Sequence, residues 1–119
     1  MAEKPETRFK NRIRPKLEAI PNSYWVKIDQ MSQRGVPDFH GCISGQMILI
    51  ELKASNKEAP SKLQEWHLQK AANAGALCFV VNPENWENTY QLLQELSCDN
   101  EVYTQEFRPI LVDGKNDYN

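Results

Sequence analysis

The chain lacks any long apolar run, and its first ten residues are polar and charged. A helix that spans a bilayer needs about 20 consecutive apolar residues. A secretory signal needs an apolar stretch behind a short basic start. Because the sequence shows neither pattern, it argues against a membrane-spanning helix, and we expect a cytoplasmic protein.

The sequence is also poor in cysteine, with three residues at positions 42, 78 and 98. An odd number at wide spacing fits neither a disulfide framework nor a four-ligand zinc site. We interpret them as ordinary thiols of a reducing compartment. Repeats and low-complexity segments are lacking too, and 119 residues suit a single domain over 1–119. We expect a core over about residues 6–97 and a frayed tail from about residue 113.

Net charge is small, only −2, but it is unevenly distributed. Residues 1–62 hold 11 Lys/Arg against 7 Asp/Glu, a balance of +4, whereas residues 63–119 hold 3 against 9, a balance of −6. Such asymmetry is a weak hint of a polyanionic partner on one face. Basic residues alternate through positions 8–16, which a solvated helix face explains equally well.

Hydrophobic spacing predicts a first helix over about 6–20. Phe9, Ile13, Leu17 and Ile20 recur at helical intervals and define one apolar face. Pro15 conflicts with this pattern, because it removes a helix hydrogen bond, and we expect it to kink or split the segment.

Three strands are predicted next, over 24–29, 38–43 and 46–53. The last two flank Ser44-Gly45, which is typical of a β-hairpin with a two-residue turn. Residues 47–50 are all apolar, as in a central strand that is buried on both faces.

A second helix is predicted to begin at Ser61, with Gln64 completing a capping box and Gly75 ending the helix. An apolar strand over 76–81 follows, which implies a parallel pair joined by a crossover helix. Asn82-Pro83 is predicted to start a third helix, with Pro at its first position. Residues 102–112 are a candidate edge strand. The order predicts an α/β domain with a mixed sheet flanked by helices.

The hairpin also predicts a pair of carboxylates. If Ser44 and Gly45 form the turn, Ile43 pairs with Gln46, and Asp38 falls directly opposite Glu51. Opposed residues project on the same side of a sheet, with Cβ atoms about 4.5–5.5 Å apart. Lys53 lies two residues after Glu51, so it shares that side.

Two carboxylates this close either share a proton or hold a cation. Hard oxygen ligands suit Mg²⁺, which also binds substrate phosphate. The alternative is a surface charge cluster balanced by Lys53. The apolar run before Glu51 weakens this alternative, because an uncompensated charge near a core is costly.

Two further residues are accessory candidates. Glu6 falls within the apolar arc of the first helix, where it could reach the same metal; alternatively, it only favours the helix N-terminus. Gln64 is explained by the capping box alone, but it could also stand at the mouth of the site.

These residues resemble a known family. Pro37-Asp38 and Glu51-Leu52-Lys53 resemble the PD-(D/E)XK nuclease signature, and the αβββαβ order resembles the core of that superfamily. With Glu6, Gly35-Val36 and Gln64 added, the chain is similar to the VRR-NUC branch, in particular to stand-alone virus-type Holliday-junction resolvases. The resemblance covers roughly 6–81.

The resemblance implies a role for each residue. Asp38, Glu51 and the Leu52 backbone carbonyl would bind Mg²⁺ or Mn²⁺, and Lys53 would orient the attacking water. Glu6 and Gln64 would be accessory catalytic residues. The candidate DNA contacts are the following basic residues: Arg8, Lys10, Arg12, Arg34 and Lys62.

The implied function is a metal-dependent DNA endonuclease of phage type that acts in DNA repair or recombination. Junction cleavage needs two symmetric cuts, so a homodimer is expected. Three alternatives remain open: a flap, end or duplex nuclease of the same fold, a non-catalytic DNA-binding module, and a phosphohydrolase for small nucleotides.

Overall fold

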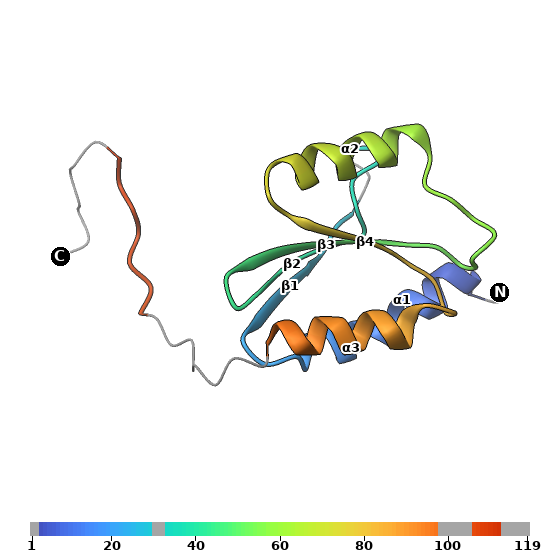
Figure 1. Cartoon of the computed structure of the whole chain (residues 1–119), viewed down its shortest axis with the longest axis horizontal. Helices are drawn as coiled ribbons and strands as arrows, with labels where there is room; N and C mark the ends of the chain where they lie inside the picture. The colour runs from blue at the N-terminus through green and yellow to red at the C-terminus, as the bar shows by residue number, and fades with distance from the viewer. Residues whose placement is uncertain (1–2, 30–32, 98–105, 113–119) are drawn as a thin grey trace.

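The computed structural model describes residues 3–29, 33–97 and 106–112. The helices and strands follow the predicted order, with these bounds: α1 Pro5–Glu18, β1 Ser23–Lys27, β2 Phe39–Ile43, β3 Gln46–Leu52, α2 Lys62–Asn73, β4 Leu77–Val81 and α3 Trp86–Leu96. The strands form one sheet in the order β1-β2-β3-β4. The first two pairings are antiparallel and the β3–β4 pairing is parallel, which confirms the mixed sheet. Helix α2 covers one face, and α1 and α3 cover the other (Figure 1).

The β2–β3 hairpin has the predicted turn and register. Ser44 and Gly45 have φ angles of 48° and 87°. Positive φ at both central positions is the conformation of a type I′ turn, whose twist matches that of the strands. Ile43 pairs with Gln46, and Phe39 pairs with Ile50 at the other end of the ladder.

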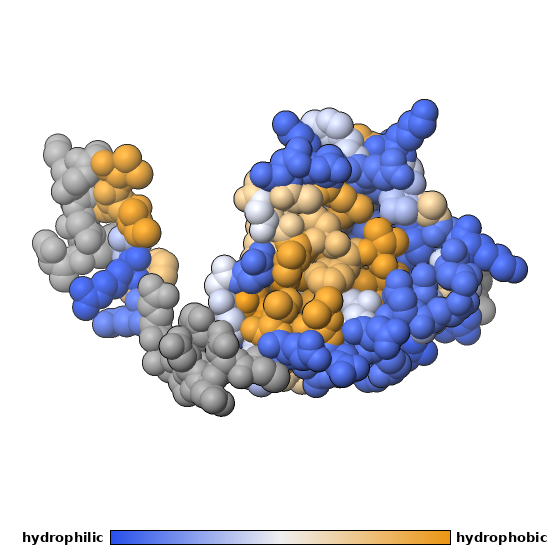
Figure 2. Space-filling view, viewed as in Figure 1, coloured by the Kyte–Doolittle hydropathy of each residue, from blue (hydrophilic) through white to orange (hydrophobic). Residues whose placement is uncertain are grey.

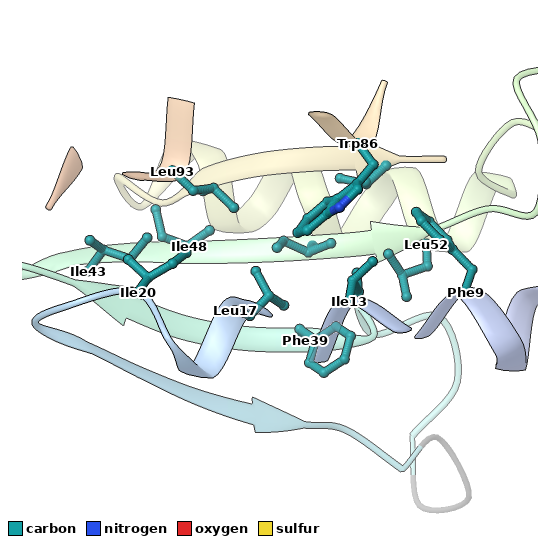
Figure 3. Close-up of a cluster of buried hydrophobic side chains, with 12 residues drawn as sticks. Phe9, Ile13, Leu17, Ile20, Phe39, Ile43, Ile48, Leu52, Trp86 and Leu93 are labelled. Atoms are coloured by element: carbon teal, nitrogen blue, oxygen red, sulfur yellow. The ribbon is translucent and has the colours of Figure 1, made fainter. Parts of the chain in front are cut away.

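The main core lies between the sheet and the α1–α3 face. Alternate residues of β3, namely Ile48, Ile50 and Leu52, point into it and are fully buried. They meet the predicted apolar face of α1 and the ring of Trp86 from α3 (Figure 3). Leu49 points to the opposite face and is also buried, so β3 is the expected central strand.

Helix α2 is well capped but poorly buried. Ser61 and Gln64 form the predicted capping box, and Gly75 follows the helix with φ +104°. None of the α2 residues is classed as buried, in contrast to α1 and α3. The sheet face beneath α2 is therefore only partly covered.

The predicted split of the first helix at Pro15 is wrong. Helix α1 continues from Pro5 to Glu18 with Pro15 inside it. The N–H that proline lacks would have bonded to the Asn11 carbonyl four residues earlier. Both residues are exposed, so water can satisfy that carbonyl.

The predicted start of the third helix is also wrong, since α3 begins at Trp86 rather than at Pro83. The Asn82 side chain accepts hydrogen bonds from the N–H groups of Glu84 and Asn85, at 2.8 and 3.0 Å. These are the bonds that an N-cap side chain makes, so Asn82 does cap this segment. Residues 83–85 nevertheless form a turn, which the Asn85 side chain closes by accepting from the Asn82 N–H at 2.9 Å.

The predicted edge strand over 102–112 is only partly open to comparison, because residues 102–105 lie outside the described residues. Its described part, 106–112, contains no strand. Within the described residues, no helix is long and apolar enough to cross a membrane.

Candidate metal centre

The two predicted carboxylates come together where the hairpin ends. Asp38 lies one residue before β2, and Glu51 is the last residue but one of β3. The ladder that pairs Phe39 with Ile50 brings the next two positions, Asp38 and Glu51, opposite each other. Their residues are only 5% and 2% exposed. The register read from the turn therefore placed them correctly.

Asp38 is held by the backbone of β3 and by a lysine of α1. Its Oδ2 accepts a hydrogen bond from the Leu52 N–H at 2.7 Å. Its Oδ1 lies 3.2 Å from Lys10 Nζ. These contacts fix the carboxylate without the side-chain freedom that an exposed aspartate would have.

Glu6 completes a group of three carboxylates. One oxygen from each of Glu6, Asp38 and Glu51 lies within 4.8 Å of the others. The three residues come from α1, from the position just before β2 and from the end of β3. Like charges at this separation repel, so the group needs protons or a cation.

Glu51 is the most perturbed member of the group. Its Oε2 accepts a hydrogen bond from Gln64 Nε2 at 2.9 Å and lies 3.5 Å from Lys53 Nζ. Its Oε1 is buried and has no hydrogen-bond donor among the described residues. Burial, followed by the nearby charge of Asp38, raises the pKa of Glu51 to about 8. Burial and Asp38 also raise the pKa of Glu6.

Gln64 serves the helix cap and the site together. Its N–H and Oε1 bond to Ser61 in the capping box, at 3.2 and 2.8 Å. The same Oε1 accepts from Lys53 Nζ at 2.9 Å, while Nε2 donates to Glu51. The two interpretations of Gln64 are therefore compatible, because its Oε1 accepts from Ser61 and from Lys53 at once while its Nε2 donates to Glu51.

The donor set fits a hard divalent cation. Three carboxylates provide oxygen ligands, and Glu51 Oε1 is a buried acceptor that a cation would satisfy. The Leu52 N–H points to Asp38, and the carbonyl of a strand residue points to the same side as its N–H. By this alternation the Leu52 carbonyl is expected on that side as well, and its role as a ligand stays a prediction.

The basic residues that we expected on DNA are divided by the structure. Lys10 belongs to the centre itself through its contact with Asp38. Arg8 and Arg12 line a hollow of about 290 Å³ beside Ala54, the residue that follows Lys53. Arg34 and Lys62 are exposed on other parts of the surface.

Sequence reasoning missed Lys27 at the end of β1. Lys10, Lys27, Asp29 and Asp38 line a hollow of about 570 Å³ next to the carboxylates. The signal for Lys10 was present, since it lies four residues after Glu6 and therefore on the same side of α1. For Lys27 no local pattern existed, because its position depends on how β1 pairs.

Comparison with known proteins supports this fold through structure rather than sequence. No protein-family model matches the chain, and no curated protein matches it. Among solved structures, the chain is similar to one described as a VRR_NUC domain, with a TM-score of 0.60 over 79% of this chain and 95% of that one. Sequence identity is 20%. The chain therefore has the fold of a VRR_NUC domain, as the sequence predicted.

Proposed function

We propose that this protein is a divalent-metal-dependent endonuclease of the VRR-NUC type that hydrolyses phosphodiester bonds in DNA. The observation that carries the proposal is the meeting of Glu6, Asp38 and Glu51 beside Lys53 at one end of the sheet. The shared fold adds support, because the similar structure is described as a VRR_NUC domain.

The cation would be Mg²⁺ or Mn²⁺, held by Asp38, Glu51 and the Leu52 carbonyl, with Glu6 within reach. When bound, such an ion polarises a phosphoryl oxygen and lowers the pKa of a bound water. The chain itself holds the ligands in place: Leu52 N–H and Lys10 orient Asp38, and Gln64 orients Glu51.

Lys53 is the residue that we assign to the attacking water. Its Nζ is fixed between Glu51 Oε2 and Gln64 Oε1, at 3.5 and 2.9 Å. An ammonium group in that position adds a fixed positive charge where negative charge develops in the transition state. Gln64 acts through Lys53 and Glu51 and is therefore a positioning residue.

DNA would approach over the end of the sheet where α1 begins. Arg8 and Arg12 flank the hollow beside Ala54, and Lys27 flanks the hollow beside Asp38. Cations in these places would contact backbone phosphates, which position a nucleic acid without reading its sequence. Branched DNA, such as a four-way junction, is the substrate we propose, cut by a homodimer that supplies two sites.

The direct test uses charge-removing substitutions at the two central ligands. Asp38→Asn and Glu51→Gln should each reduce cleavage by at least about a hundredfold, because loss of a ligand charge weakens cation binding. Both variants should remain folded, since each amide is close in size to the carboxyl group it replaces. Glu65→Gln, an exposed change next to Gln64 in α2, is the matched control and should cleave normally.

Cleavage retained in Asp38→Asn or Glu51→Gln would reject the proposed centre. Calorimetric titration with Mn²⁺ provides a second measurement that does not depend on the substrate. Binding of Mn²⁺ without cleavage of any DNA would instead favour a non-catalytic DNA-binding module.

Substrate choice is tested with labelled junction, flap and linear DNA in Mg²⁺, Mn²⁺ or EDTA. Paired, symmetric cuts in the junction are the expected result, and EDTA should abolish them. Preferential cutting of flaps, ends or linear duplexes would contradict the junction proposal but would still support a nuclease activity.

A further inference from the structure

Strand β4 has an outer edge with no neighbouring strand among the described residues. Lys53 N–H donates to the Val81 carbonyl at 2.8 Å, so Val81 turns its backbone groups toward β3, and Phe79 and Leu77 do the same by alternation. Cys78 and Val80 therefore turn theirs outward. At the two ends of this edge, the Val80 carbonyl accepts from Asn85 Nδ2 and the Ala76 N–H donates to the Ala71 carbonyl, both at 3.0 Å. The groups left for pairing are therefore the Ala76 carbonyl, both backbone groups of Cys78 and the Val80 N–H.

Apolar side chains border this edge on both faces of the sheet. Val80 of β4 and Trp66 of α2 are exposed on one face, where a groove of about 780 Å³ runs between the two elements. Leu77 of β4 and Leu92 of α3 are exposed on the other face. Figure 2 shows the apolar area over β4 between α2 and α3. Exposed apolar surface beside an unpaired strand edge is a site for strand addition.

The chain carries a segment suited to such an edge. Residues 106–112, Glu-Phe-Arg-Pro-Ile-Leu-Val, form neither helix nor strand. Phe107, Ile110 and Val112 are 83%, 91% and 98% exposed. We call this segment the C-terminal arm. Large apolar side chains at this exposure leave unburied surface that a partner can cover.

Pro109 fixes how the arm can pair. Proline has no N–H, so it is tolerated in an edge strand only where that position faces away from the neighbour. Arg108, Ile110 and Val112 would then turn their N–H groups toward β4. The side chains of Ile110 and Val112 would cover one face of the sheet and Leu111 the other, which matches the apolar surface on both sides of β4.

The topology disfavours parallel pairing between the arm and β4 of the same molecule. Helices α2 and α3 lie on opposite faces of the sheet (Figure 1). If the arm continued the sheet beyond β4, the β4–α3–arm connection would have the opposite hand to the β3–α2–β4 connection. Such parallel crossovers are right-handed in about 98% of cases.

We propose that the arm pairs with the outer edge of β4 in a second copy of this chain, so that two copies exchange arms about a two-fold axis. Eight residues, 98–105, join Ser97, the C-cap of α3, to the arm. They lie outside the described residues, but their number allows a reach of about 26 Å at about 3.3 Å per residue. The inference deepens the homodimer of the proposed function by naming the surface that forms it.

The test is the oligomeric state of the full-length chain without DNA, measured by sedimentation over a range of concentrations. The wild type should be a dimer. An Ile110→Asp, Val112→Asp double variant should weaken dimerisation at least tenfold, because it charges the pairing face of the arm. Both positions are exposed, so the fold of the domain should not change.

A matched pair of substitutions tests the edge. Val80→Lys on β4 should weaken the dimer by a similar factor, whereas Val26→Lys on β1, at the opposite edge of the sheet, should not. The two valines are equally exposed, at 36% and 37%. If Val80→Lys fails to fold by circular dichroism, Leu92→Lys on the surface of α3 takes its place.

Three results would overturn arm exchange: a wild type that is monomeric at every concentration, a dimer that survives the arm variant, or equal effects of Val80→Lys and Val26→Lys. A monomer whose arm resists protease would show that the arm folds back on its own β4. A dimer that forms through the arm but cleaves no DNA would reject the proposed nuclease activity and leave arm exchange standing. A monomer that cleaves DNA would reject arm exchange and leave the nuclease proposal standing.

Discussion

Glu51 is a buried carboxyl group that cannot be satisfied by the described residues alone. Its Oε1 lacks a donor, and its pKa is raised to about 8 by burial and by Asp38. In the unfolded chain a glutamate has a pKa near its ordinary value of 4.5. The difference links the stability of the fold to pH.

The metal-free protein should therefore lose stability as pH rises. Below pH 4.5 the Glu51 carboxyl group is protonated in both the folded and the unfolded chain, so the stability of the fold is not reduced by its ionisation. Between 4.5 and about 8 only the unfolded chain releases the proton, and the free energy of unfolding should fall by a few kcal/mol. Urea denaturation in EDTA at several pH values measures this. Glu51→Gln should flatten the slope, and an unchanged slope would contradict the assignment.

Lys10 is the counter-charge of Asp38 when no cation is bound. Their atoms Nζ and Oδ1 are 3.2 Å apart, and both side chains are largely shielded from solvent. Lys10→Met should lower the metal-free stability by about 1–3 kcal/mol, because it leaves a buried charge unpaired. Saturating Mn²⁺ should restore most of the loss.

Lys16→Met is the control for Lys10→Met, since Lys16 is exposed on the same helix. Thermal denaturation with and without Mn²⁺ compares the two variants. Equal behaviour of both would mean that Lys10 has no special relation to the centre.

At the scale of the element, the hairpin turn determines which side chains meet. Gly45 has φ +87°, and a Cβ added there would touch nothing within 4 Å. Gly45→Ala should therefore cost only the backbone strain, about 1 kcal/mol of unfolding free energy.

Substitution of Gly41, in the middle of β2, should have a larger effect on stability. A Cβ at this position would overlap the Trp25 ring from β1. Gly41→Ala should cost more than Gly45→Ala, about 2 kcal/mol or above, since the ring must move within a packed sheet. Chemical denaturation of both variants checks the order. If Gly45→Ala instead loses more unfolding free energy than Gly41→Ala, the turn would matter more to stability than the contact between Gly41 and Trp25.

The hairpin could be predicted from the sequence because its geometry depends on residues that are close together in the chain. Ser44-Gly45 sets the turn, the turn sets the register, and the register pairs Asp38 with Glu51. The start of α3 could not be predicted in the same way, because the Asn85 side chain closes a turn before the helix by accepting from the Asn82 N–H. The place of Lys27 beside Asp38 depends on how β1 pairs with β2, which no short pattern encodes.

At the scale of the whole molecule, cation binding should stabilise the folded chain. The three carboxylates come from α1, from the residue before β2 and from β3, so they meet only when the domain is folded. A cation at about 100 times its dissociation constant should add about 2.7 kcal/mol to the free energy of unfolding. For a domain of this size, the melting temperature should rise by about 10 °C.

Calorimetric melting with Mg²⁺, Mn²⁺ or EDTA measures this shift. Asp38→Asn should reduce it, whereas the exposed control Glu65→Gln should keep it. A melting temperature that is the same in all three solutions would mean that the carboxylate group does not bind these ions.

The two-residue turn also limits how this hairpin can evolve. Each residue added to one strand must be matched by one on the other, or the facing side chains no longer correspond. The separation between Asp38 and Glu51 in the chain can therefore change only in steps of two, and it remains odd while the turn keeps its length. Between Lys53 and Ser61 no strand pairing constrains the number of residues, so related proteins should differ freely in the length of this loop. The difference in residue number between their two acidic residues should nevertheless stay odd.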